Sequence, residues 1–147
     1  CIRDSNGSWA GKSYLILGSC LGSSWTINLS NADYSFVGES GGDFSGGAST
    51  QAVGLSSDGS IVAIGAWAVD GGGKISGTVN FYEINSGSWE QIGSDIDGKN
   101  AGDLFGSSVS LSSDGSIIAI SSTRHDLGGS DNTGLIRIFK NNSGSSI

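Results

Sequence analysis

The chain has 147 residues, including 26 Gly but no Pro and no Met, and its formal net charge is −7 at pH 7. This length holds one ordinary domain with a core of its own. The acidic balance and the absence of a Lys/Arg stripe argue against phosphate-directed nucleic-acid binding and disfavour anionic membrane surfaces. No apolar stretch approaches the roughly 20 residues of a spanning helix, so we expect no membrane insertion.

Short apolar runs interrupt the Gly/Ser-rich sequence, for example at 13–17, 61–64 and 135–139. Disordered chains lack such runs because they bury too little apolar surface to offset chain entropy. Helical periodicity does not extend over ten or more residues anywhere in the sequence. The composition therefore predicts a globular, all-β chain with many tight turns.

The N-terminal part contains both cysteines, Cys1 and Cys20. Two buried thiols remain an alternative, but we expect a disulfide, which would stabilise the fold by about 3 kcal/mol. Asn-x-Ser sequons at Asn6, Asn28 and Asn141 favour an oxidising compartment, although such triplets also arise by chance here. We predict an extracellular or cell-surface glycoprotein. Because the first residue is not Met, we expect a processed chain or a segment of a longer one.

An internal repeat organises the chain. Segment 55–64 (LSSDGSIVAI) recurs as 111–120 (LSSDGSIIAI), with nine of ten positions identical. Upstream, 42–44 matches 102–104; downstream, 77–83 matches 134–140 and, more faintly, 11–17. The two copies of the first segment begin 56 residues apart (111 − 55), and a period of this order is typical of stacked supersecondary units. We predict one repeat domain over 1–147, with a partial unit at 11–37, repeat one at 38–93 and repeat two at 94–147.

Within each copy the apolar residues alternate, as strands require. Val79 and Phe81 are predicted to share an inner face, and Ile136 and Ile138 are their counterparts. The Asp-Gly pair of each copy predicts a tight hairpin turn. Each unit is therefore expected to form about four short antiparallel strands, the blade of a β-propeller.

The order of motifs also points to a family. A Gly-Asp-x-Phe-Gly element (102–106) precedes an Asp-Gly turn and an apolar strand, which ends in Gly65-Ala66 in the first copy. This order resembles the FG-GAP repeat, which builds seven-bladed propellers in integrin α-subunits and in many bacterial and algal surface proteins. Segments 11–18 and 32–39 look like the linking strands between such blades.

The calcium loop of the family, Asp-x-Asp-x-Asp-Gly, is degenerate here. Loops 56–60 and 112–116 keep only the last carboxylate, and apolar Val62 and Ile118 stand at the later ligand position. Calcium needs about six to eight oxygen ligands, so we expect no metal in these loops and no cofactor. A weak calcium site in the acidic segment 95–103 remains an alternative to plain turn capping.

Seven blades would need nearly 400 residues at about 56 each, so we predict an open or incomplete propeller. Segment 11–37 looks like the closing strands of a missing blade, and 134–147 like a blade without its last strand. An open stack keeps unpaired strand edges that attract other chains. Neighbouring subunits would complete each other's blades head to tail, as a ring or a filament. The alternative is a fragment of a longer propeller.

Two segments resemble catalytic motifs but lack features that those motifs require. Segment 42–47 resembles the Gly-Asp-Ser-Gly-Gly of trypsin-like proteases, but Phe44 interrupts it, and the one histidine, His125, is predicted to be a solvated loop residue. A nucleophile elbow around Cys20 would need a following helix. We predict that the chain is not an enzyme.

The four tryptophans, Trp9, Trp25, Trp67 and Trp89, are expected to pack in the core or between blades, with stacking on sugars as the alternative. We thus predict an extracellular structural or adhesive repeat protein whose partner is itself, as a homo-oligomer or filament. The alternative function is a ligand- or glycan-binding module of a larger cell-surface propeller, with glycans or cell-surface proteins as partners.

Overall fold

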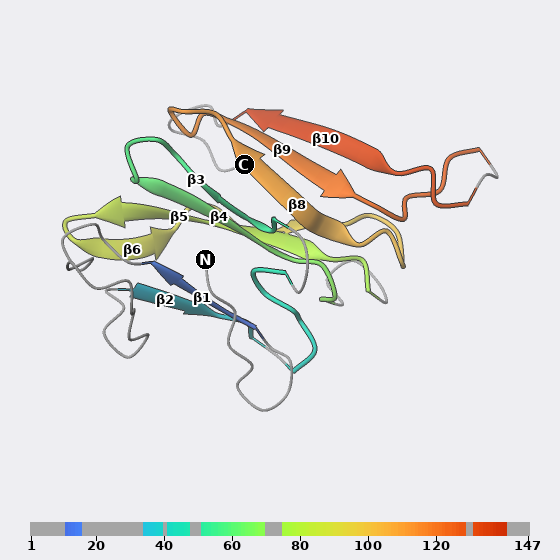
Figure 1. The fold of residues 1–147 in the computed structure, drawn as a ribbon, viewed down its shortest axis with the longest axis horizontal. Helices are drawn as coiled ribbons and strands as arrows, with labels where there is room; N and C mark the ends of the chain where they lie inside the picture. Colours follow the sequence, from blue (N-terminus) through green and yellow to red (C-terminus); the bar gives the residue numbers. More distant parts are fainter. Residues whose placement is uncertain are drawn as a thin grey trace, which may run out of the picture.

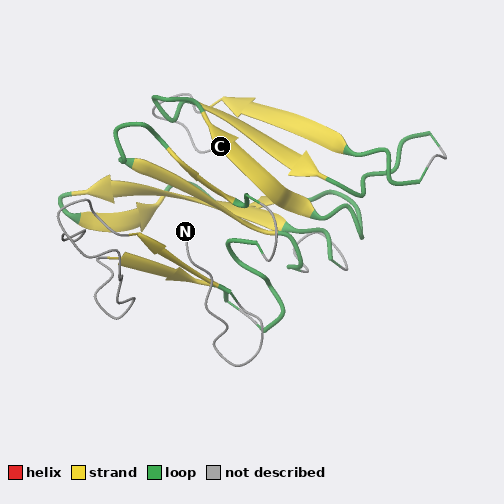
Figure 2. Cartoon of the chain, viewed as in Figure 1, coloured by secondary structure: helices red, strands yellow, loops and turns green. Residues whose placement is uncertain are grey.

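The computed structural model describes residues 11–15, 34–39, 41–47, 51–69, 75–128 and 131–140. These ranges form ten β-strands and no helix (Figure 2), which confirms the all-β expectation. The strands are β1 (Lys12–Leu15), β2 (Tyr34–Val37), β3 (Val53–Leu55), β4 (Ile61–Ala66), β5 (Thr78–Asn85), β6 (Ser88–Gln91), β7 (Ile96–Asp97), β8 (Phe105–Leu111), β9 (Ile117–Ser122) and β10 (Leu135–Lys140). No helix long and apolar enough to cross a membrane occurs in these ranges.

The strands form three antiparallel sheets, which lie over one another as layers (Figure 1). Sheet A consists of β1 and β2. Sheet B has the order β3-β4-β5-β6, and β7 also pairs with β5. Sheet C has β9 between β8 and β10. Within each sheet the strands that follow one another in the chain pair directly, except that β7 pairs with β5 and not with β6.

The hairpin turns of sheets B and C are built alike, as the Asp-Gly pairs predict. Gly59 donates its N–H to the Ser56 carbonyl (3.0 Å), and Gly115 donates to the Ser112 carbonyl (2.9 Å). Both glycines have a positive φ, 73° and 70°, which a residue with a side chain adopts only under strain. The prediction of two hairpin turns is confirmed.

The main core lies between sheets B and C. Val79 and Phe81 of β5 are 0% and 1% exposed, so the inner face predicted for the first copy is confirmed. Complete burial of a side chain such as Phe81 contributes about 1.5–3 kcal/mol. The buried cluster comprises Ala63, Val79, Phe81, Phe105, Val109, Ile118 and Ile120.

The inner face predicted for the second copy is wrong. Ile136 and Ile138 of β10 are 68% and 72% exposed. The opposite side of the strand faces the core, where Phe139 meets Phe105 edge-on (6.3 Å between centroids) and Arg137 lies over the same ring at 5.4 Å. The alternation is the same as in β5, but no described sheet covers the Ile136/Ile138 side.

Sheet A meets sheet B through the same backbone contact that joins sheet B to sheet C. A Cβ atom on Gly11 would lie 2.3 Å from the Ser45 carbonyl oxygen, and one on Gly77 would lie 2.0 Å from the Phe105 carbonyl oxygen. The main chain of one unit thus rests on the main chain of the next at both junctions. The adjoining hydrogen bonds repeat as well: Gly38 N to Gly11 O (3.1 Å) and Gly98 N to Gly77 O (2.8 Å).

A substitution at Gly65 on β4 tests this close packing. Its φ is not positive, so an added side chain is limited by steric contact and not by backbone conformation. A Cβ there would lie 2.1 Å from the Gly106 carbonyl oxygen of sheet C. We expect Gly65→Ala to lower the free energy of unfolding by about 1–3 kcal/mol, measured by urea denaturation, because sheet C must move outward. Gly54→Ala on β3 is the control, since its Cβ would meet its nearest atoms at 3.5 Å. Equal losses in both variants would contradict the prediction.

Candidate functional site

The residues predicted to carry covalent modifications lie outside the described residues. They are Cys1 and Cys20, predicted to form a disulfide, and Asn6, Asn28 and Asn141, predicted to carry glycans.

The two Asp-Gly turns use their carboxylates as caps. Asp114 Oδ1 accepts hydrogen bonds from Ser112 Oγ (2.6 Å), Ser116 N (3.0 Å) and Ser116 Oγ (2.8 Å). These bonds, with that of the Ser112 hydroxyl foremost, lower the pKa of Asp114 to about 2. The pKa of Asp58 is lowered by the same arrangement, first by the Ser56 hydroxyl. The one carboxylate in each loop is thus engaged in closing the turn.

The acidic segment 95–103 does not converge on one point. Gln91 Nε2 donates to Asp95 Oδ1 (2.5 Å), whereas Asp103 Oδ2 contacts Asn100 Nδ2 and His125 Nδ1, both at 3.0 Å. Among the described residues, no group of three or more His, Cys, Asp or Glu is placed to hold a metal ion.

The prediction of a solvated His125 is wrong. Its side chain is 14% exposed, because the buried Asp103 takes it as a partner.

Two tryptophans are half-buried and pack against other aromatic rings, and for Trp89 this confirms the expected packing between units. Trp67 stacks on Phe44 with 4.8 Å between ring centroids. Trp89 meets Tyr34 and Phe36 edge-on at 6.0 and 5.8 Å, so it joins sheet B to sheet A. The tryptophans outside the described residues are Trp9 and Trp25.

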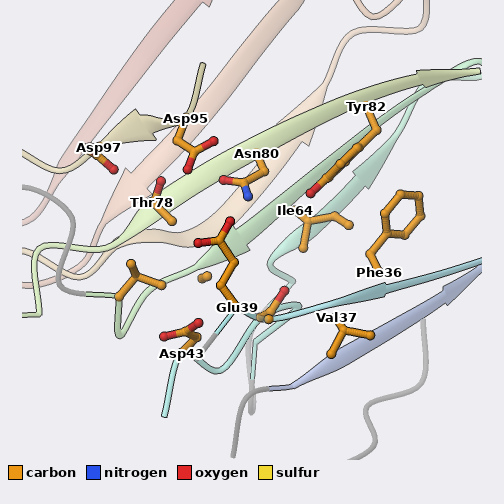
Figure 3. Close-up of a pocket in the computed structure, with 14 residues that line it drawn as sticks. Phe36, Val37, Glu39, Asp43, Ile64, Thr78, Asn80, Tyr82, Asp95 and Asp97 are labelled. Atoms are coloured by element: carbon orange, nitrogen blue, oxygen red, sulfur yellow. The ribbon is translucent and has the colours of Figure 1, made fainter. Parts of the chain in front are cut away.

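A cavity of about 270 Å³ lies between sheets A and B (Figure 3). Phe36 and Tyr82 contribute an apolar wall, with their ring centroids 4.7 Å apart. Asn80 lines the cavity from β5, and its Oδ1 is buried with no hydrogen-bond partner. Carboxylates form the polar wall: Glu39, Asp43, Asp95 and Asp97. Glu39, Asn80 and Asp95 point toward a common space in Figure 3.

The cavity lies where repeat two has a phenylalanine in the corresponding position. Ser45 and Phe105 each follow a residue with positive φ, Phe44 (52°) and Leu104 (55°), so they hold equivalent places in the backbone. The Phe105 ring is 0% exposed and fills the space between sheets B and C. Ser45 lines the open space between sheets A and B. Sequence reasoning missed this site, although aligning the copies at 42–46 and 102–106 sets the serine against the phenylalanine.

The chemistry of the cavity is that of a small, negatively charged pocket. Its described lining includes four carboxylates and no Lys or Arg. Such a wall favours cations and hydroxyl donors over anions, and the paired rings would cover an apolar part of a ligand.

The second candidate site is the outer face of sheet C, defined here by Ile117, Ala119, Ser121, Ile136 and Ile138. The strand register places Ala119 opposite Ile138 and Ser121 opposite Ile136. Exposed apolar residues are ordinary when scattered, but a contiguous patch on neighbouring strands marks an interaction surface. Sequence reasoning missed it because alternation identifies the two faces of a strand without showing which one is covered.

Comparisons with protein-family models, with curated proteins and with solved structures found no match.

The Asp114 turn cap makes stability depend on acid. Because the pKa of Asp114 falls from 3.8 to about 2 on folding, its contribution is complete above pH 4 and is lost as the pH falls through 2. We expect Asp114→Asn to lower the thermal midpoint at pH 6 and to converge with the parent chain near pH 2. Asp131→Asn, at an exposed loop position, is the control. A difference that stays constant from pH 6 to pH 2 would refute the capping role.

The cavity predicts that Ser45→Phe is accommodated, because it copies the arrangement of Phe105. We expect the free energy of unfolding to rise by about 1 kcal/mol or more as apolar area is buried. Ser88→Phe on exposed β6 is the control, with an expected effect within about 0.5 kcal/mol. Urea denaturation measures both, and a marked loss of stability in Ser45→Phe would show that the space cannot take the ring.

Proposed function

We propose that this chain is a non-catalytic structural repeat protein of the FG-GAP propeller type, which works outside the cell by assembling head to tail with further copies of itself. A main-chain contact that recurs at both junctions between sheets supports the proposal. Gly11, just before β1 of sheet A, meets the Ser45 backbone, and Gly77, just before β5 of sheet B, meets the Phe105 backbone, so the fold grows by adding one sheet onto the face of the previous one. A unit that stacks in this way is suited to extension.

The observation that carries the proposal is the contrast between two equivalent faces. Val79 and Phe81 are buried under sheet C, whereas their counterparts Ile136 and Ile138 are more than two-thirds exposed. Leaving isoleucines in water is unfavourable by about 1.5–3 kcal/mol each relative to burial. An assembly that covers them removes this cost.

The free strand edges support assembly as well. Within the described chain, β10 pairs only with β9, whereas β5, its counterpart, pairs with β4 on one side and with β6 and β7 on the other. An unpaired edge offers N–H and C=O groups to an incoming strand. Completion of a blade by a neighbouring copy would use this edge.

The cavity between sheets A and B favours a second function, a ligand- or glycan-binding module of a larger cell-surface propeller. Carboxylates and two aromatic rings around about 270 Å³ suit a small ligand that carries hydroxyl or ammonium groups. This function predicts a monomer with a discrete site, which separates it from the first.

Light scattering and negative-stain microscopy on the unreduced protein test the proposed assembly. We expect rings or filaments with a subunit repeat. Salt should strengthen association, because it screens the repulsion between chains of net charge −7. A monodisperse particle with the mass of one chain, at every salt and protein concentration, would refute self-assembly and favour the binding module.

A further inference from the structure

The outer face of sheet C corresponds to the face of sheet B that is already covered. The β9 residues Ile117 and Ala119 correspond to Ile61 and Ala63, and Ile136 and Ile138 of β10 correspond to Val79 and Phe81. On sheet B this face packs against sheet C, where Ala63, Val79 and Phe81 belong to the buried core. The corresponding face of sheet C is apolar in the same places and carries no sheet among the described residues.

Sheet C also has the glycine that, at the equivalent position in sheet B, lies in close contact with the main chain of the next sheet. Gly134 corresponds to Gly77 and has a similar φ, 74° against 82°. At Gly77 the Phe105 backbone of the next sheet is in close contact. At Gly134 the nearest backbone atoms are Ser122 O and Thr123 O, at 3.8 and 3.9 Å from a Cβ, and both belong to its own unit.

One position differs and sets the spacing. Ser121 stands where Gly65 lets the Gly106 carbonyl approach to 2.1 Å of a Cβ position. An incoming sheet must therefore lie further out over Ser121 than sheet C lies over Gly65, and the contact is centred on Ile136 and Ile138.

The existing contact between sheets B and C shows whether a second copy that docks in the same way would use the same face or a different one. Sheets B and C meet through unlike faces: Val79 and Phe81 of one lie against Ile118 and Ile120 of the other. A repeated contact of this kind is heterologous, so it extends as a ring or a filament instead of closing as a two-fold dimer.

Charge does not oppose contact at this face. The outward residues of β9 and β10 include one charged side chain, Lys140, and no acid. A partner with the same overall charge of −7 therefore meets no concentrated negative patch here.

We propose that the outer face of sheet C is the acceptor surface for a second copy of this chain, which docks on it through a different face and so adds head to tail. This inference rests on the proposed function and identifies the contact by which it operates. Ile136 and Ile138 are the central residues of the acceptor surface, and Gly134 receives the partner's main chain.

The test uses Ile138→Asp in the full chain, with Leu127→Asp as the matched control. Leu127 is 69% exposed in the loop between β9 and β10, so it loses the same kind of apolar side chain away from the outer face of sheet C. Thermal unfolding checks that each variant folds, and Ile136→Asp serves as a second variant of the surface.

Alone, Ile138→Asp is expected to need about tenfold more protein, or more, for half-assembly than the parent chain in light scattering, whereas Leu127→Asp assembles like the parent. A fluorescently labelled Ile138→Asp chain mixed with parent chains is expected to enter assemblies once each, at one end, and to shorten them. Its donor face is intact, so it adds to an end and then stops growth.

Three results are decisive in the other direction. If Ile138→Asp and Ile136→Asp assemble like the parent, the outer face of sheet C is not the contact, although self-assembly stands. If Ile138→Asp neither assembles nor enters parent assemblies, like faces pair with like and the head-to-tail contact is wrong. If the parent chain itself is monomeric, the proposed function fails first, and the acceptor surface fails with it.

Discussion

Direct main-chain contact between neighbouring sheets is the constraint on which the rest of this structure depends. Gly77 lies under the Phe105 backbone, and Gly65 lies under Gly106, so sheets B and C approach with no side chain between them at these points. Close backbone approach at one end of the strands allows small core residues such as Ala63 to be fully buried and leaves room for Phe81 and Phe105 further along. The high glycine content follows from this packing as well as from the turns.

The three layers of the stack differ in how well this packing is satisfied. Between sheets B and C, the Phe105 ring completes the core. Between sheets A and B, Ser45 takes the same backbone position, and a cavity lined by carboxylates is left. On the far side of sheet C, no described sheet covers the apolar face. The stack of three sheets thus has a filled junction, a hollow junction and an uncovered face, and the last two are the places where binding can be selected without disturbing the core.

Much of the fold was predictable because it is encoded locally. Alternation in Val79 and Phe81 and the Asp-Gly turns depend on residues a few positions apart, and the structure confirms both. The errors arose where a partner far along the chain decides the outcome. The pattern of β10 is that of β5, yet burial of Ile136 and Ile138 depends on a sheet that the pattern cannot supply. His125 likewise lies against Asp103, 22 residues away, and no local signal indicates that contact. The cavity could have been found, since it depends on one aligned difference between the copies.

The charge distribution supports the proposed head-to-tail stacking of copies. The chain carries a net charge of −7, and part of its acid lies in turns, where serine hydroxyls and backbone N–H groups hold Asp58 and Asp114. The outer face of sheet C carries one charged side chain, Lys140. A strand that lies between two layers needs apolar or small residues on both of its sides. The central strand of sheet C, β9, has this composition on both sides: Ile118 and Ile120 face the core, while Ile117 and Ala119 face outward. A strand that stayed at the surface would gain solubility from polar residues on its outward side. The composition of β9 is therefore that of an internal layer, and a further sheet on its outer side would give it the surroundings that β4 already has.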